Sequence, residues 1–141
     1  MKTVASILFF LFLIACSSKQ SEADSEMKEW AEMDSFHMIM AESFHPYKDS
    51  ANLAPAREMA KEMADEAGQW AAAQLPEKVS NDEMKAKLQK LADGSQTFLK
   101  LTIENAPDSV LGKSLTDLHN VFHEIQEGWY SDKKEEKHEH H

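Results

Sequence analysis

The sequence predicts an all-α protein, specifically an up-down-up-down four-helix bundle, and three observations lead to that prediction. Apolar residues recur at every third or fourth position through four segments of about 20 residues each. Glycine and proline are few, and prolines follow three of these segments, at Pro46, Pro76 and Pro107. No segment sustains the alternation of apolar and polar residues that is typical of a strand. Four amphipathic helices joined by short loops pack as antiparallel neighbours.

The first helix is predicted from about residue 26 to residue 45, and the second from about residue 53 to residue 75. Pro46 is expected to end the first helix, because proline restricts the residue before it to extended conformations. Pro55 lies in the first turn of the second helix, where a missing N–H has no cost. The expected core stripes are Trp30, Met33, His37, Met40 and Phe44, followed by Leu53, Ala56, Ala60, Met63, Ala67 and Trp70.

The third and fourth helices have recognisable starts. Residues 80–83 read SNDE, a capping box that predicts the start of the third helix. Gly94, in the middle of that helix, predicts either a kink or a close contact with another helix. The fourth helix is expected to open after Pro107, with Asp108 as its N-cap. Their core stripes are Met84, Leu88, Leu91, Ser95 and Phe98, and Leu111, Leu115, Leu118, Phe122, Ile125 and Trp129.

The first 25 residues predict a leader and a tether rather than part of the bundle. Lys2 precedes an apolar run over residues 4–14, which is too short to span a bilayer permanently. The run ends in the segment LIAC, which resembles the lipobox of bacterial lipoproteins. The small polar residues after Cys16 predict a flexible tether over residues 16–25. The lipobox resemblance implies that residues 1–15 are removed and that Cys16 is lipidated. It also implies a lipid-anchored protein of the bacterial cell envelope, in the outer membrane because Ser17 follows the cysteine.

Composition excludes several classes of function. The formal net charge of −10 argues against a nucleic-acid partner, which would require a basic surface. The single cysteine leaves no disulfide and no CxxCH motif for covalent haem attachment. No motif of a hydrolase, a nucleotide-binding protein or a zinc protease is present, so no enzyme activity is expected. A bundle over residues 26–131 remains, followed by a charged tail at residues 132–141 that is predicted to be disordered.

Histidines on the first and fourth helices suggest a metal site. His119 and His123 have the i, i+4 spacing that lets two imidazoles chelate one ion from a helix. Each helical residue adds 1.5 Å along the helix axis. When depth is measured from the bundle end that the first and fourth helices share, His37 is therefore expected at the level of His119. The predicted ligands are therefore His37, His119 and His123, with a fourth from Met33, Met40, Met63 or the carboxylates Glu62 and Glu66.

The donor types narrow the choice of metal to copper or zinc. Histidine with a thioether and without a thiolate suits copper, whereas three imidazoles suit zinc, nickel or copper. Imidazole binds metal in its neutral form, so the affinity is predicted to fall below about pH 6. His45 either joins a second ligand set with Glu42 or is only a terminal residue. The tail histidines His138, His140 and His141 either capture metal loosely or merely solvate the chain end.

Two resemblances and one simpler interpretation complete the hypotheses. A bundle of this length with methionine in its first helix and histidine in its last resembles the cytochrome b562 and cytochrome c′ group. That resemblance implies noncovalent haem held by Met33 or Met40 with His119 or His123, for electron transfer. The segments FHP at residues 44–46 and LHNVFHE at residues 118–124 are similar to those of small envelope proteins of uncharacterised function, which implies that His45, His119 and His123 form one functional set.

Methionine is also common filling in helix cores, so a bundle whose histidines merely pack remains possible. The sequence thus leaves three functions open. The first is a metal-binding envelope lipoprotein for storage, sensing or delivery. The others are a haem protein and a structural or interaction bundle.

Overall fold

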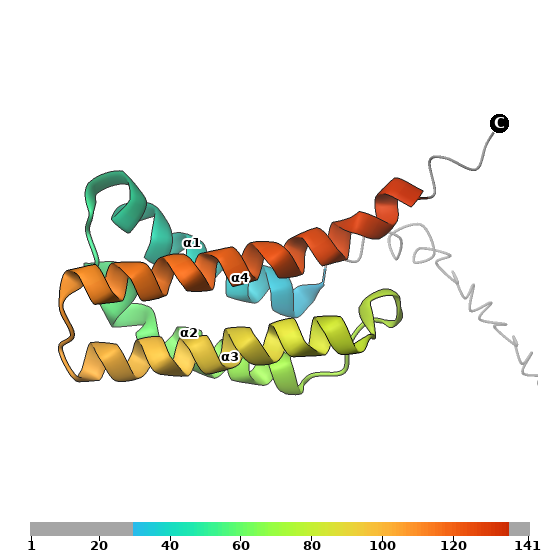
Figure 1. Ribbon diagram of the computed structural model, residues 1–141, viewed down its shortest axis with the longest axis horizontal. Helices are drawn as coiled ribbons and strands as arrows, with labels where there is room; N and C mark the ends of the chain where they lie inside the picture. The colour runs from blue at the N-terminus through green and yellow to red at the C-terminus, as the bar shows by residue number, and fades with distance from the viewer. Residues whose placement is uncertain (1–29, 136–141) are drawn as a thin grey trace, which may run out of the picture.

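The computed structural model describes residues 30–135, which form a bundle of four helices and confirm the predicted fold class (Figure 1). Each helix packs against the next along the chain, and α4 returns to pack against α1, which gives the up-down-up-down order. Within this part of the chain, no helix has the length and apolar character needed to cross a membrane. The elements are α1 (Ala31–Ser50), α2 (Ala54–Ala72), the 3-10 turn η2 (Glu77–Val79), α3 (Asp82–Ile103) and α4 (Asp108–Glu135).

The core consists of the predicted apolar stripes. Every residue of the four stripes is buried except His37, which is exposed. Trp70 lies at the centre of an aromatic cluster: its ring is 5.0 Å from that of Trp30 and 5.8 Å from that of Phe36. Burial of such large rings from several helices contributes a large share of the hydrophobic free energy that stabilises the domain.

The contact between α1 and α4, called the α1–α4 seam below, is the least extensive of the four helix–helix contacts. Large rings from both helices fill this seam and hold the two backbones apart. The packing face of α2, by contrast, is mostly alanine, which lets backbones approach closely. The ring pairs across the seam are Trp30 with Trp129, Phe36 with Phe122, and Phe44 with His119.

The prediction that Pro46 ends the first helix was wrong. α1 begins at Ala31 and continues through Pro46 to Ser50. Proline removes only its own N–H from the helix, whereas its carbonyl still accepts hydrogen bonds from Asn52 N–H at 3.1 Å and from the Ser50 hydroxyl at 3.0 Å. The last turns of α1 bend away from the bundle, as expected at a proline (Figure 1).

Two predicted caps are also displaced by one residue. The N-cap of α3 is Asn81 rather than Ser80, and its side-chain oxygen accepts the Met84 N–H at 2.8 Å. Asp108 is the first helical residue of α4 rather than its cap. Its carboxylate accepts a hydrogen bond from the Arg57 guanidinium at 2.6 Å, which connects the start of α4 to the start of α2.

α4 ends at Glu135, beyond residue 131, where the bundle was predicted to end. The added residues include Lys133, Lys134 and Glu135, which are good helix formers, and neither glycine nor proline interrupts them. The start of the predicted tail is therefore helical. The remaining tail, with His138, His140 and His141, lies outside the described residues.

Gly94 lies at a close contact between α3 and α4, which is one of the two roles predicted for it. A Cβ at this position would lie 2.8 Å from Leu118 Cδ2 of α4. α3 continues through this glycine, so the absence of a side chain serves close packing rather than a break in the helix.

Replacing Gly68 by alanine is expected to raise the free energy of unfolding by about 0.5–1 kcal/mol. Gly68 is helical and exposed, and a Cβ there would meet nothing within 4 Å. Urea denaturation of the variant checks this. Gly112→Ala is the matched control, because its Cβ would overlap the Tyr47 ring and should bring no gain. Equal stabilisation by both changes would contradict the packing argument.

Candidate functional site

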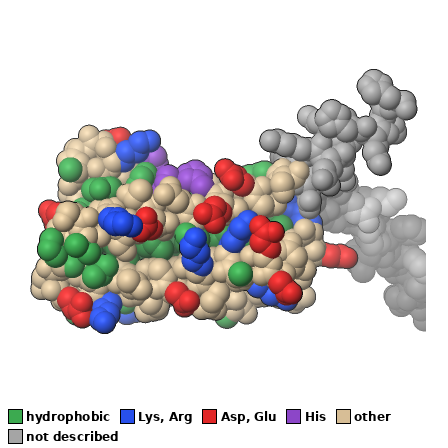
Figure 2. Space-filling view, in the orientation of Figure 1, with side chains coloured by type: hydrophobic (Ala, Val, Ile, Leu, Met, Phe, Trp, Pro, Cys, Tyr) green, Lys and Arg blue, Asp and Glu red, His purple; other side chains and the backbone are tan. Residues whose placement is uncertain are grey.

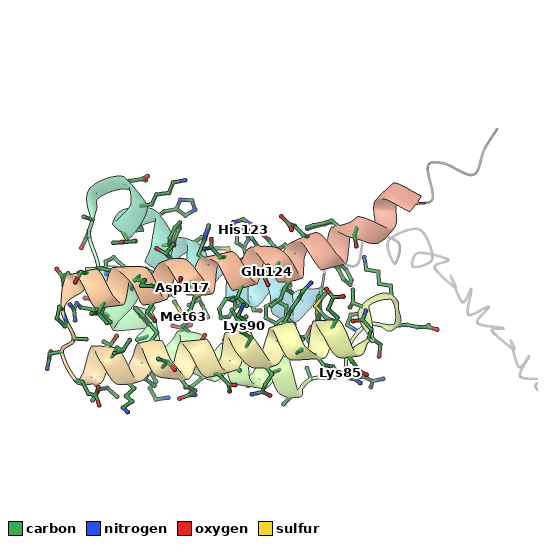
Figure 3. The ribbon with its side chains drawn as sticks, viewed as in Figure 1. Met63, Lys85, Lys90, Asp117, His123 and Glu124 are labelled. Atoms are coloured by element: carbon green, nitrogen blue, oxygen red, sulfur yellow. The ribbon has the colours of Figure 1, made fainter. Side chains whose placement is uncertain are left out.

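The centre of the candidate site is the imidazole pair His119 and His123, one turn apart on α4. Their ring centroids are 4.4 Å apart, the rings are nearly perpendicular at 80°, and the two Nε2 atoms are separated by 3.1 Å. This is the distance of an N–H···N hydrogen bond between the two rings. Histidine side chains gather on one edge of the molecule (Figure 2), and His123 lies on the edge of α4 (Figure 3).

The same separation suits two ligands of one metal ion. Zinc and copper hold imidazole nitrogens at about 2.0–2.1 Å, so two nitrogens 3.1 Å apart would subtend about 100° at a shared ion. This angle lies between those of square-planar and tetrahedral coordination, about 90° and about 109°. Metal binding requires both Nε2 lone pairs, so each ring would then carry its proton on Nδ1.

Phe44 of α1 positions the first member of the pair. The His119 ring lies on the Phe44 ring with their centroids 3.8 Å apart and an angle of 12° between the planes. Phe44 is itself 8% exposed and therefore held by the core. The sequence indicated Phe44 only as core filling; its role depends on the alignment of α1 with α4, which the sequence pattern did not reveal.

The surroundings of His119 keep its imidazole neutral. Burial against the protein is the largest cause that lowers the pKa of His119, followed by repulsion from His123, Lys48 and His45, and together they bring the pKa to about 4. A neutral imidazole is the form that binds metal. His119 is therefore ready to act as a ligand through most of the mildly acidic range.

The metal-free protein is expected to lose stability between about pH 6.5 and about pH 4 because of His119. In this window the unfolded chain binds a proton at His119 that the folded chain does not, so the free energy of unfolding falls as the pH is lowered. Because the ring is partly open to solvent, the loss is expected to be about 1 kcal/mol. Urea denaturation at pH 7.5 and pH 4.5 should show this difference, and His119→Phe should reduce it. An equal loss in both proteins would contradict this assignment.

The other predicted histidine ligands do not converge on the pair. His45 is exposed at the same end of the seam and acts on His119 electrostatically. His37 stacks on Phe122 at 5.6 Å with an angle of 17°, so it lies about one turn from the predicted level. Within the described part of the chain, no three or more histidine, cysteine, aspartate or glutamate side chains are close enough together to hold a metal ion.

The predicted thioether ligands belong to the core. Met33 and Met40 are each 1% exposed and Met63 is fully buried, between the helices (Figure 3). Met33 and Met40 are also the methionines of the predicted haem pair, so that pair would join a core residue to His119 or His123, which lie at the surface of the seam. Glu62 and Glu66 are on α2, which does not form the seam. Cys16 lies outside the described residues.

Comparison of the chain with models of protein families, with curated proteins and with solved structures finds no match. The comparisons therefore add no support to the resemblance to the cytochrome b562 and c′ group or to the lipoprotein and envelope-protein resemblances. What the structure establishes is an all-α domain with four helices and an imidazole pair on one seam.

Proposed function

We propose that this protein binds a transition-metal ion, copper or zinc, through His119 and His123 on the α1–α4 seam. The observation that carries the proposal is the 3.1 Å separation of the two Nε2 atoms, which suits two ligands of one ion. The ligands come from consecutive turns of one helix, so their separation depends little on how the helices pack.

Three further properties support metal binding at this pair. Stacking on Phe44 restricts the His119 ring, so less rotational freedom is lost when an ion binds. The lowered pKa of His119 keeps the imidazole unprotonated, so no proton must be displaced from it near neutral pH. His123 is exposed, so an ion reaches the pair directly from solvent.

An exposed two-imidazole site suits reversible loading better than a permanent structural metal. Structural zinc sites are closed by four protein ligands, whereas this pair leaves coordination positions open to solvent or to another donor. Storage, sensing or delivery of the ion is the proposed role, with the lipid at Cys16 holding the protein at the bacterial envelope, in the outer membrane. The tail histidines would add a second, looser capture of the same ions.

Metal content and titration of the whole chain test this function. The chain should carry His138→Ala, His140→Ala and His141→Ala, so that the tail cannot bind, and should be purified in detergent without metal-affinity resin. Mass spectrometry for metals and titration with Cu²⁺ and Zn²⁺ should show stoichiometric binding. A folded chain that binds neither ion would refute the function. A Soret band in the purified protein would instead favour the haem alternative.

A further inference from the structure

The imidazole pair is an incomplete metal site by itself. Zinc in closed protein sites takes four ligands in tetrahedral geometry, and His119 and His123 supply two. No third histidine, cysteine, aspartate or glutamate joins them to make a ligand group among the described residues. A zinc ion on this pair must therefore complete its coordination with water or with donors from another molecule.

The pair lies where another molecule can reach it. His123 is exposed, and the histidine side chains form a patch on the surface of the molecule (Figure 2). An open groove of about 470 Å³ adjoins this patch, and it is lined by His123, Gln126, Glu127, Tyr130 and Ser131. Tyr130 is 45% exposed and two turns along the same face of α4, so it offers apolar surface next to the ligands.

On the basis of the metal-binding function proposed above, we propose that a second copy of this chain completes the zinc site. His119 and His123 of each copy would then hold one ion between them. A twofold axis through the ion makes both halves use the same surface, as in most homodimers. Two Nε2 atoms 3.1 Å apart would subtend about 100° at a shared ion, close to the tetrahedral angle, so two pairs crossed at right angles would provide the four imidazoles of a tetrahedral site.

Charge makes this association depend on the ion. Each chain has a formal net charge of −10, so two metal-free copies repel one another. A bound dication offsets part of this overall repulsion. The protein is therefore expected to be monomeric without metal and dimeric with zinc.

Light scattering with size-exclusion chromatography, performed with and without Zn²⁺ on the whole chain in detergent, tests the inference. The same tail histidine-to-alanine changes serve as the background. With zinc, the protein mass in each complex should double, with about half an ion bound per chain, and EDTA should reverse both. His119→Ala should remain monomeric, whereas His37→Ala, which removes a histidine of the seam outside the pair, should still dimerise.

The other outcomes separate the two proposals. One zinc ion per monomeric chain would overturn the bridged dimer and leave the metal-binding function standing. A dimer that persists in EDTA and in His119→Ala would show that the copies associate without the pair and would also overturn the bridge. A folded chain that binds no zinc and no copper would refute both proposals together.

Discussion

Replacing His119 by alanine is expected to lower the affinity for Zn²⁺ or Cu²⁺ at least about 100-fold. Loss of a group that only orients a metal ligand typically costs 10–100-fold, and His119 is proposed as a ligand itself. The remaining His123 would be one imidazole on a helix surface, without the chelation that the 3.1 Å pair provides. Titration with a competing metal indicator measures the change.

His37→Ala is the matched control for this experiment. His37 is also exposed on the seam and also stacks on an aromatic ring, but its partner is Phe122 rather than Phe44. Its removal is expected to leave the affinity nearly unchanged. Equal losses in the two variants would show that His37 joins the pair as a third ligand. An unchanged affinity in a folded His119→Ala variant would place the bound ion elsewhere.

Replacing Trp70 by alanine is expected to lower the free energy of unfolding by about 3–5 kcal/mol. Trp70 is fully buried and contacts the rings of Trp30, Phe36 and Phe122, so truncation leaves a cavity between α1, α2 and α4. Domains of this size have a total stability of about 5–15 kcal/mol, so the loss is a large part of the whole. Urea denaturation followed by circular dichroism measures it.

Two further variants show whether the loss comes from the cavity. Trp70→Phe should cost less than Trp70→Ala, because it keeps a ring and removes the indole N–H, which is buried without a hydrogen-bond partner among the described residues. Tyr130→Ala removes an aromatic ring that is 45% exposed and should change stability only slightly. A loss in Tyr130→Ala as large as that in Trp70→Ala would contradict the argument.

The positions of the predicted ligands show where inference from the sequence stopped. His37 was placed at the level of His119 by measuring depth from the expected end of the first helix at residue 45. α1 in fact ends at Ser50, five residues later, which is a shift of about 7.5 Å along the helix axis. In the structure, His37 lies beside Phe122, and Phe44 lies beside His119. The expected helix end at residue 45 was therefore the wrong reference point for the depth of His37.

The sequence by itself determined the four helices, their order, the buried face of each, and the spacing of His119 with His123. These features depend on the period of the helix, which acts within a few residues of the chain. Tertiary structure alone decided which residues of α1 meet which residues of α4, and thus which ring supports His119 and which histidines stay apart. That alignment depends on where the helices end and how aromatic side chains pack across the seam, and no local pattern specifies either.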